Sequence, residues 1–362
     1  MKPNISDKLN GANEELKKSL ERLEIRENEI KGQMEKARND MRHRLEKTFQ
    51  RCNSRIYRCD FHAHSTYSDG RCDIDEIHQW MGHAGIDFMA ITDHNTILQK
   101  ADCSRYPDMW YGEEITTKGR FHHIVGLNIS EKLNPEEMDI EETVQAVRKQ
   151  GGFPVIAHPC GWYGNPYPPE RIQVAEKIGG RFAIEIGNAA DNIFDYFDET
   201  DEEAVRFWDK LLLEGKEVVG LGDTDEHHCY QIGVVWNGVI CNSLTREKIL
   251  EAVTKGHLFV SNGPIAILKM EEAMMGDAVY TGKGKLSFKV ECYDDYGLYK
   301  IRIVKNGELF KELKLEEEKE AKFEFEDQLT TDFAYYRVEC HTLDGKRAYS
   351  NPIRIFSENV LR

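Results

Sequence analysis

The stretch from residue 59 to residue 70, with the sequence CDFHAHSTYSDG, concentrates residue types that bind metal ions. His62 and His64 are two positions apart, so on an extended strand both imidazoles project to the same face. Asp69 follows just past the expected end of that strand. Two imidazoles and a carboxylate that converge in this way form a typical ligand pattern for divalent metals. The alternative is that the histidines pair with neighbouring groups and that Asp69 and Gly70 only form a turn.

Similar groups recur further along the chain, each close to the end of an apolar run. They are Thr92-Asp93-His94-Asn95, Glu113-Glu114, His122-His123, Ala157-His158-Pro159, Glu185 with Asn188, and the run Asp223-Thr224-Asp225-Glu226-His227-His228. Burying such ionisable groups without partners costs free energy, whereas metal coordination removes that cost and accounts for the mixture of imidazole and carboxylate. The recurrence therefore favours a metal site over the turn.

Elements that position these groups alternate between short apolar runs and helical patterns. Strands are predicted over residues 56–62, 88–93, 110–115, 122–127, 153–158, 182–186 and 217–222. Helices are predicted over residues 73–84, 135–150, 168–178, 201–214 and 244–255. This alternation indicates an α/β fold with a parallel sheet and helices outside. Because the suspected ligands come from most of the strands, we expect a closed or nearly closed seven-stranded βα barrel rather than an open sheet, with the ligands at its C-terminal mouth.

The residue patterns at the two ends of the chain differ from the pattern of its middle. This difference predicts three units, with bounds 1–52, 53–263 and 264–362. The first unit carries an a/d stripe, interrupted at Glu27, which is formed by Leu16, Leu20, Leu23, Ile30, Met34, Ala37 and Met41. It predicts an amphipathic helix, either in a coiled coil that sets the oligomeric state or packed on the main domain. The third unit alternates strictly over 286–293 and contains a hairpin pattern around Asn306-Gly307, which predicts an antiparallel β-sandwich. We expect no chemistry in it; it would cover the barrel, form an interface or only add stability.

Composition narrows the class of protein. The chain has 362 residues and a formal net charge of −16, which argues against general nucleic-acid binding. Its apolar runs are too short to span a membrane, and residues 1–8 lack the apolar segment of a secretory signal. The nine cysteines have no CxxC spacing, so we interpret them as reduced thiols of a cytoplasmic protein. A site made cationic by metals could still bind a small anionic substrate.

Taken together, the motifs resemble one known family. They are His62-x-His64 with Asp69, Thr92-Asp93-His94, Gly112-x-Glu114, His123-Ile-Val-Gly126, Ala157-His158-Pro159 and Asp225-x-His227. In this order, over residues 56–262, they resemble the PHP (polymerase and histidinol phosphatase) superfamily. The segment 256–264 and the end of the chain around 349–353 are similar to the carbaryl hydrolase-related (CehA/McbA-like) branch.

The resemblance implies a distorted seven-stranded βα (TIM-like) PHP barrel that holds three divalent metal ions, which would be Zn, Mn or Fe. The first ion would be held by His62, His64, Glu114 and Asp225, the second by Glu114, His123 and His158, and the third by Asp69, His94 and His227. All nine positions carry a residue able to ligate, which favours an active enzyme. Strand alternation points only one residue of each adjacent pair inward, and the motif spacing favours Glu114, His123 and His227 over the alternatives Glu113, His122 and His228.

The expected activity is that of a metal-dependent phosphoesterase acting on a small phosphate ester or a nucleotide phosphoester. Metals lower the pKa of a bound water toward neutrality, so the nucleophile would be a metal-bound hydroxide, and His228 or Asp223 would act as general acid. Asp93 could orient a ligand imidazole, and Glu185 and Asn188 could touch substrate. The alternatives are a carbamate, amide or ester hydrolase with the same site, or a non-catalytic scaffold.

Basic residues in the loops mildly favour the phosphate reaction over these alternatives. They are Arg71, Lys100, Arg105, Lys118 and Arg120. A homo-oligomer could form through the N-terminal helix or through the β-domain.

Overall fold

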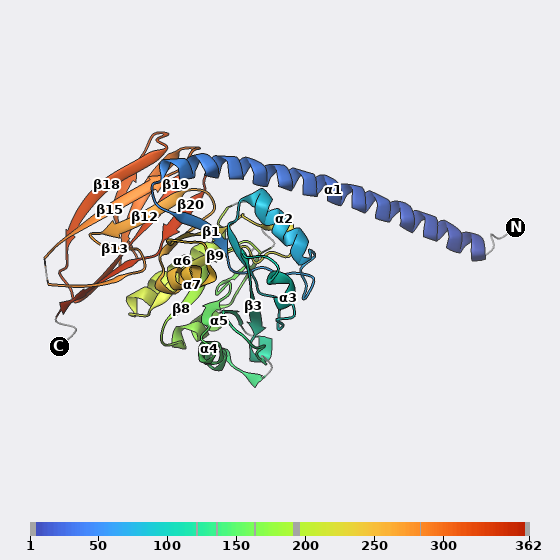
Figure 1. Cartoon of the computed structure of the whole chain (residues 1–362), viewed down its shortest axis with the longest axis horizontal. Helices are drawn as coiled ribbons and strands as arrows, with labels where there is room; N and C mark the ends of the chain where they lie inside the picture. The colour runs from blue at the N-terminus through green and yellow to red at the C-terminus, as the bar shows by residue number, and fades with distance from the viewer. Residues whose placement is uncertain are drawn as a thin grey trace.

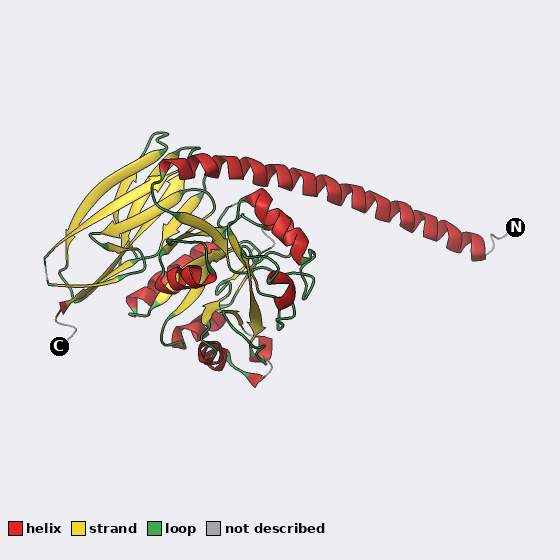
Figure 2. Cartoon of the chain, in the orientation of Figure 1, coloured by secondary structure: helices red, strands yellow, loops and turns green. Residues whose placement is uncertain are grey.

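The structure is a computed structural model that describes residues 5–120, 122–134, 137–162, 164–190, 196–282 and 284–358. Within these ranges, the side chains of residues 5–24, of Glu27 and of Arg120 are not described. An α/β body lies beside a β-sandwich, and the long helix α1 (Ile5–Arg51) runs along both and extends well beyond them (Figures 1 and 2). Among the described helices, none is both long enough and apolar enough to cross a membrane.

Seven neighbouring strands build the sheet of the α/β body. In spatial order they are β1 (Ile56–Asp60), β2 (Phe88–Ile91), β3 (Met109–Thr116), β4 (His123–Leu127), β5 (Phe153–Ile156), β8 (Phe182–Asn188) and β9 (Val218–Asp223). Just beyond β1 and β9, an isolated parallel bridge joins Ala63 to Glu226. The backbone N–H of Asp225 also donates to the carbonyl of His62 at 2.8 Å. The first and last strands therefore meet at the edge that carries the predicted ligands.

The prediction of a fully parallel sheet is wrong at β4, which is antiparallel to both β3 and β5. The connection from β3 to β4 comprises only residues 117–122. A connection this short can join antiparallel strands, whereas a parallel crossover needs a dozen residues or more. The reversal places His123, the first residue of β4, opposite Thr116 at the end of β3. The start of β4 thus lies at the same edge as the ends of its parallel neighbours.

Helices cover the sheet largely as the sequence predicts. They are α2 (Ile74–Ala84), α3 (Lys100–Cys103), α4 (Ile140–Lys149), α5 (Pro169–Val174), α6 (Glu199–Leu213) and α7 (Arg246–Lys255). A capping box begins α2, because the Asp73 side chain accepts from the Glu76 N–H and the Glu76 side chain accepts from the Asp73 N–H. The Thr245 side chain caps α7. The predicted helix over 135–150 begins at Ile140, and residues 135 and 136 lie outside the described ranges.

Two strands that the sequence analysis did not assign connect the body to the C-terminal part. β10 (Trp236–Ile240) pairs antiparallel with β1, and β11 (Leu258–Ser261) pairs antiparallel with β10. β20 (Arg347–Ser350) then pairs with β11, so one sheet runs from the body into the sandwich. The dipeptide Asn237-Gly238 in the middle of β10 is a typical turn signal, which explains why this strand was missed.

The C-terminal part is a sandwich of two sheets, as predicted. One sheet contains β13 (Ala273–Met274), β12 (Ile265–Met270), β15 (Lys285–Tyr293) and β18 (Glu320–Gln328). The other contains β14 (Ala278–Thr281), β21 (Ile353–Ser357), β19 (Phe333–Thr342), β20, β16 (Leu298–Lys305) and β17 (Glu308–Lys314). Tyr336 packs against Phe288 between them, with ring centroids 4.5 Å apart. The β16–β17 hairpin is confirmed, with Asn306 and Gly307 at positive φ, whereas β14 and β21 pair in parallel, contrary to the antiparallel prediction.

Helix α1 packs on the rest of the protein through its C-terminal part. Leu45 and Thr48 are buried, and Arg44 forms ion pairs with Asp294 at 2.8 Å and Asp344 at 2.6 Å. Of the predicted a/d stripe, Met34 and Met41 pack against the core, whereas Ile30 is exposed. Leu16, Leu20 and Leu23 lie outside the described side chains. The C-terminal part of the helix is therefore packed on the main domain, and a coiled coil in its N-terminal part remains a prediction.

Candidate metal centre

Four buried side chains from three strand ends meet at one point, and we call them the floor: His62, His64, Glu114 and Asp225. Nε2 of His62 lies 3.3 Å from Glu114 Oε2 and 3.3 Å from Asp225 Oδ1. Nε2 of His64 lies 3.2 Å and 3.0 Å from the same two oxygens. The two Nε2 atoms are themselves 3.2 Å apart. Four potential ligand atoms thus surround one small volume.

Three further side chains lie above the floor on loops, and we call them the rim: Asp69, His94 and His227. Nε2 of His94 lies 3.5 Å from Asp69 Oδ2, and Nε2 of His227 lies 3.6 Å from Asp69 Oδ1. The side chains of His94, His227 and Asp69 are 25%, 28% and 56% exposed, so the rim faces solvent. Rim and floor are close enough for His64 to lie within metal-binding distance of both.

Glu114 connects the two groups. Its Oε2 lies 2.9 Å from His94 Nδ1, in addition to its contacts with the floor histidines. Its Oε1 lies 2.7 Å from His123 Nδ1 and 3.3 Å from His158 Nε2. Both oxygens therefore face imidazole nitrogens on different sides, which is the arrangement of a bridging carboxylate. The structure brings all nine predicted ligands into one site.

Potential ligand atoms fall into three groups within 4.8 Å of one another. They are His62, His64, Glu114 and Asp225; His94, Glu114 and His123; and His64, Asp69, His94 and His227. The first group has the composition expected for the first ion. The second has His94 where His158 is expected, and the third adds His64. Every member is a predicted ligand, but His158 belongs to none of the three groups, and the division of the outer ligands differs from the expected one.

Hydrogen bonds outside the centre fix which ring nitrogen faces inward. Nδ1 of His62 lies 2.6 Å from Glu185 Oε1, and Nδ1 of His227 lies 2.8 Å from the Asp225 carbonyl oxygen. When Nδ1 donates to these oxygens, Nε2 presents a lone pair to the centre, as in metal-binding histidines. Glu114 Oε2, His94 Nδ1 and His123 Nδ1 are inaccessible to solvent, and the short contacts of Glu114 with the two imidazoles lack hydrogen-bond geometry. Converging lone pairs without donors fit a site for cations.

Electrostatics point in the same direction. Burial opposes the charge on His62, but Asp225, Glu185 and Glu114 outweigh it and raise the pKa of His62 well above its usual value. The hydrogen bond with His227 holds the pKa of Asp69 well below its usual range. The centre therefore attracts positive charge. It does so in a protein whose formal net charge is −16.

Glu185 and Asp93 position the ligands rather than line the pocket. Besides His62, Glu185 accepts hydrogen bonds from the His158 N–H at 2.7 Å and from Asn188 Nδ2 at 2.7 Å. Asp93 accepts from the Ser65 N–H at 2.8 Å and from Ser68 Oγ at 2.6 Å. It thereby holds the loop between His64 and Asp69, and no hydrogen bond from it to an imidazole is found in the described residues. The contacts of Glu185 and those of Asp93 form only when the strands that carry these residues pack together.

Two of the three neighbours of the predicted ligands, Glu113 and His122, do not line the pocket. Glu113 accepts from the Leu133 N–H at 2.9 Å, and burial raises its pKa to about 7. His122 is buried away from the pocket, and burial lowers its pKa to about 4. His228 is different because it lines the pocket.

The other predicted general acid, Asp223, lies beneath the centre. Its Oδ1 accepts from the Phe61 N–H at 2.7 Å and from Asn237 Nδ2 at 2.8 Å. Burial raises its pKa well above the usual value. Asp223 thus ties together the ends of β1, β9 and β10, and it does not line the pocket.

The pocket above the metal centre has a volume of about 350 Å³. Its wall contains Arg71, Trp162, Ala190 and His228 in addition to the ligands. Of the five basic loop residues proposed from the sequence, Arg71 lines it, and the side chain of Arg120 lies outside the described residues. Arg105 instead pairs with Asp75 at 2.5 Å.

Sequence reasoning missed two aromatic residues beside His158. Trp162 lies on the hairpin of β6 (Gly161–Trp162) and β7 (Asn165–Pro166), with its ring edge-on to the His158 ring at 5.1 Å. Tyr167 Oη lies 3.1 Å from His158 Nδ1. The aromatic and glycine-rich run Gly161-Trp-Tyr-Gly164 directly after a ligand was the available signal.

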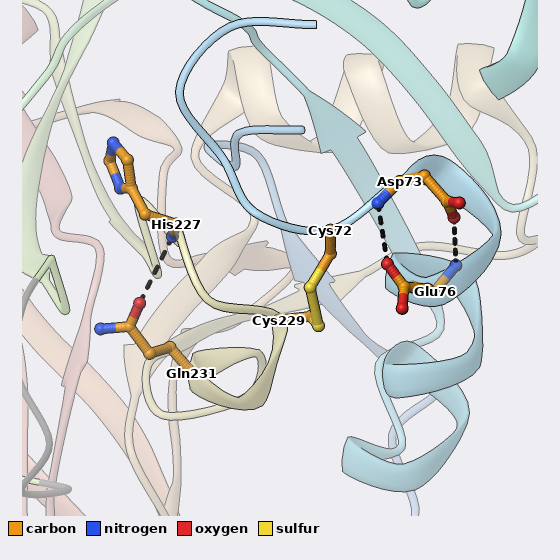
Figure 3. The surroundings of a disulfide bond; sticks show 6 residues. All are labelled: Cys72, Asp73, Glu76, His227, Cys229 and Gln231. Carbon is orange, nitrogen blue, oxygen red and sulfur yellow. Dashed lines mark hydrogen bonds between the residues drawn. A yellow bond between two sulfur atoms is a disulfide. The ribbon is translucent and has the colours of Figure 1, made fainter. Parts of the chain in front are cut away.

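A disulfide between Cys72 and Cys229 corrects the prediction that all cysteines are reduced. The two residues are 157 positions apart, and no spacing rule relates them. The fold brings the loops after β1 and β9 together, and the Arg71 N–H also donates to the His227 carbonyl at 3.0 Å. Figure 3 shows the bond between the loop that leads into α2 and the loop that follows His227. The other seven cysteines are free, and the premise of the cytoplasmic prediction no longer holds.

Comparison with known proteins gives limited similarity. No family model matches the sequence. An uncharacterized protein of Methanocaldococcus jannaschii is 36% identical over 81 residues, which cover 21% of this chain and 45% of that protein. The chain thus spans less than half the length of this curated relative.

Three solved structures are similar in part. A two-domain protein from Bacteroides vulgatus containing a predicted PHP-like metal-dependent phosphoesterase has a TM-score of 0.49 at 16% identity, over 84% of this chain and 95% of that chain. An amidohydrolase from Chromobacterium violaceum has a TM-score of 0.35 at 16% identity, over 47% and 87%. A protein from Bifidobacterium adolescentis, assigned as a metal-dependent phosphoesterase, has a TM-score of 0.37 at 13% identity, over 56% and 96%. All three scores lie below 0.5, so the chemistry of the site rests on its own residues.

Proposed function

We propose that this protein is a metal-dependent phosphoesterase of the polymerase and histidinol phosphatase type, related to the carbaryl hydrolase branch. The observation that carries the proposal is Glu114, a buried carboxylate whose two oxygens lie within 3.3 Å of nitrogens from five histidines. Three divalent ions, Zn, Mn or Fe, would be held by His62, His64, Asp69, His94, Glu114, His123, His158, Asp225 and His227. Such ions, when bound, activate water and stabilise charge on phosphoryl oxygens.

The protein's own residues would bind and orient the phosphate ester. Arg71 lines the pocket, and in the described part of the chain no carboxylate pairs with its guanidinium. A guanidinium offers paired donors that match two phosphoryl oxygens. His228 lies on the same wall and would give a proton to the leaving oxygen. Asp223, which is buried beneath the site, would act only by holding the strand ends.

The substrate would be a small anionic ester rather than a nucleic acid. The pocket of about 350 Å³ admits a phosphoryl group and a short alcohol portion. A cation in its wall favours phosphate over an uncharged carbamate, amide or carboxylic ester, which would gain little from Arg71.

The test is a substrate panel with protein reconstituted in Mn, Zn or Fe. We expect hydrolysis of phosphomonoesters, or of short phosphodiesters, to exceed that of a carbamate, an amide and a carboxylic ester. Glu114→Gln should abolish it, whereas Glu113→Gln, on the opposite face of the same strand, should retain it. Preferred turnover of the carbamate would support the alternative hydrolase. Absence of turnover in all metal-loaded forms would support the scaffold.

A further inference from the structure

A second pocket adjoins the metal centre and involves helix α1. Its volume is about 530 Å³. It is lined by residues from α1, from the start of α2 and from the loop after β9, namely Arg26, Ile30, Lys31, Arg71, Cys72, Glu76, His228, Cys229 and Tyr230. Arg71 and His228 also line the first pocket, so the two pockets meet at these side chains. Reaching α1 from the metal centre therefore requires a ligand to pass these two side chains.

The charge of the second pocket is opposite to that of the whole chain. Arg26, Lys31 and Arg71 supply three cations. In the described part of the chain none of the three is paired with a carboxylate. The single acid in the wall, Glu76, accepts the Asp73 N–H at 3.1 Å as part of the α2 cap. On a protein with a formal net charge of −16, such a group of cations indicates an anionic ligand.

The remaining wall suits a flat or apolar portion of a ligand. The rings of His228 and Tyr230 are stacked with centroids 5.4 Å apart and an interplanar angle of 18°. Ile30 and the Cys72–Cys229 disulfide add apolar surface to the same wall. The pocket therefore combines aromatic and apolar surface with three positive charges, one of which, Arg71, also lines the first pocket.

We propose that this second pocket binds a distal anionic group of the substrate. The inference rests on the proposed function, and it narrows the substrate class to phosphate esters whose alcohol portion carries a second phosphate or a carboxylate. The scissile phosphate occupies the metal pocket beside Arg71. The middle of the substrate lies along His228 and Tyr230, and the second anion meets Arg26 and Lys31. Helix α1 thereby becomes part of the substrate-binding site.

Matched aromatic esters test this assignment in the metal-loaded full chain. Phenyl phosphate carries one anionic group, whereas 4-carboxyphenyl phosphate and 1,4-phenylene bisphosphate add a carboxylate or a phosphate. We expect kcat/KM to be about tenfold higher for at least one of the two doubly anionic esters, mainly through KM. The double variant Arg26→Ala/Lys31→Ala should remove this preference and leave phenyl phosphate unchanged. The control Lys36→Ala/Lys47→Ala removes two exposed cations of α1 outside the pocket and should leave both properties unchanged.

A binding measurement separates failure of the pocket from failure of the proposed function. Titration calorimetry would compare phenylphosphonate with benzene-1,4-diphosphonate, which are not hydrolysed. Tighter binding of the diphosphonate that disappears in Arg26→Ala/Lys31→Ala supports the pocket even if no ester is turned over. Equal affinity for both compounds, or an equal loss for both in the double variant, overturns it even if phenyl phosphate is hydrolysed.

Discussion

The floor and the rim of the metal centre use the same residue types but hold them in different ways. The floor residues His62, Glu114 and Asp225 are buried at strand ends, and Glu185 fixes His62 through a 2.6 Å contact. The rim residues lie on loops and face solvent, and the loops that carry Asp69 and His227 are joined by the Cys72–Cys229 disulfide. Pre-positioned, buried ligands lose little freedom on binding a metal, whereas loop ligands must be ordered. We therefore expect the ion at the floor to bind tightly and the ion at the rim to bind more weakly.

The largest effect should follow from removing the carboxylate that joins floor and rim. Glu114→Gln removes the negative charge and replaces an anionic ligand by a neutral amide, which binds divalent ions less well. We expect loss of bound metal and a fall in hydrolysis of more than about a thousandfold. Metal analysis and a phosphatase assay would measure this, with Glu113→Gln as the control on the same strand. Retention of metal by Glu114→Gln would show that the ions lie elsewhere.

A smaller effect should follow from weakening the contact between Glu185 and His62, which holds this floor residue in place. Glu185→Gln keeps the shape of the side chain but weakens the acceptor of His62 Nδ1. We expect metal affinity at the floor to fall roughly 10- to 100-fold, the usual cost of losing such a partner. Competition with a chelator would give the affinity. If the variant binds metal as the wild type does, Glu185 does not position His62.

Removal of the disulfide should weaken metal binding at the rim and leave metal binding at the floor unchanged. Cys72→Ser/Cys229→Ser frees the loops that carry Asp69 and His227. We expect the rim ion to be lost or bound more weakly while the other ions remain, and the free energy of unfolding to fall by roughly 2–5 kcal/mol. Metal titration and thermal unfolding would measure both. Cys241→Ser, which changes a free cysteine, is the control. Loss of all ions would mean that the rim also holds the floor together.

The smallest effect should come from Tyr167, beside His158. Tyr167→Phe removes the hydroxyl that lies 3.1 Å from His158 Nδ1 and keeps the ring. We expect a change in metal affinity of about 1 kcal/mol, or roughly fivefold, with the floor unaffected. A change in metal affinity as large as the one expected for Glu185→Gln would show that His158 matters for metal binding as much as the floor residues do.

The difference between floor and rim also marks how far sequence reasoning could go. The shared face of His62 and His64 follows from strand alternation, because a period of two fixes which side chains share a face, whereas the choice of Glu114 over Glu113 needed the motif spacing. The disulfide could not be predicted, since Cys72 and Cys229 are related only by tertiary structure. The reversal of β4 was missed although the short connection at 117–122 permits only an antiparallel partner. The face on which a strand residue lies can be predicted from its neighbours in the sequence. Contacts between loops that are distant in the sequence cannot.

The pockets were the feature that could least be predicted from the sequence. Arg71 could be listed from the sequence among five basic loop residues, but only the fold places it in the wall of both pockets. The contribution of Arg26 and Lys31 depends on where α1 lies against the loop after β9, which no motif records.

The most direct test of the metal centre is the number of divalent ions per chain, measured by mass spectrometry on reconstituted, desalted protein. We predict three ions in the wild type, about two in Cys72→Ser/Cys229→Ser, and none in the double variant His62→Ala/His64→Ala, which should remain folded by circular dichroism. A wild-type protein that binds no metal, or a His62→Ala/His64→Ala protein that retains the wild-type number, would contradict the assignment of these residues as ligands.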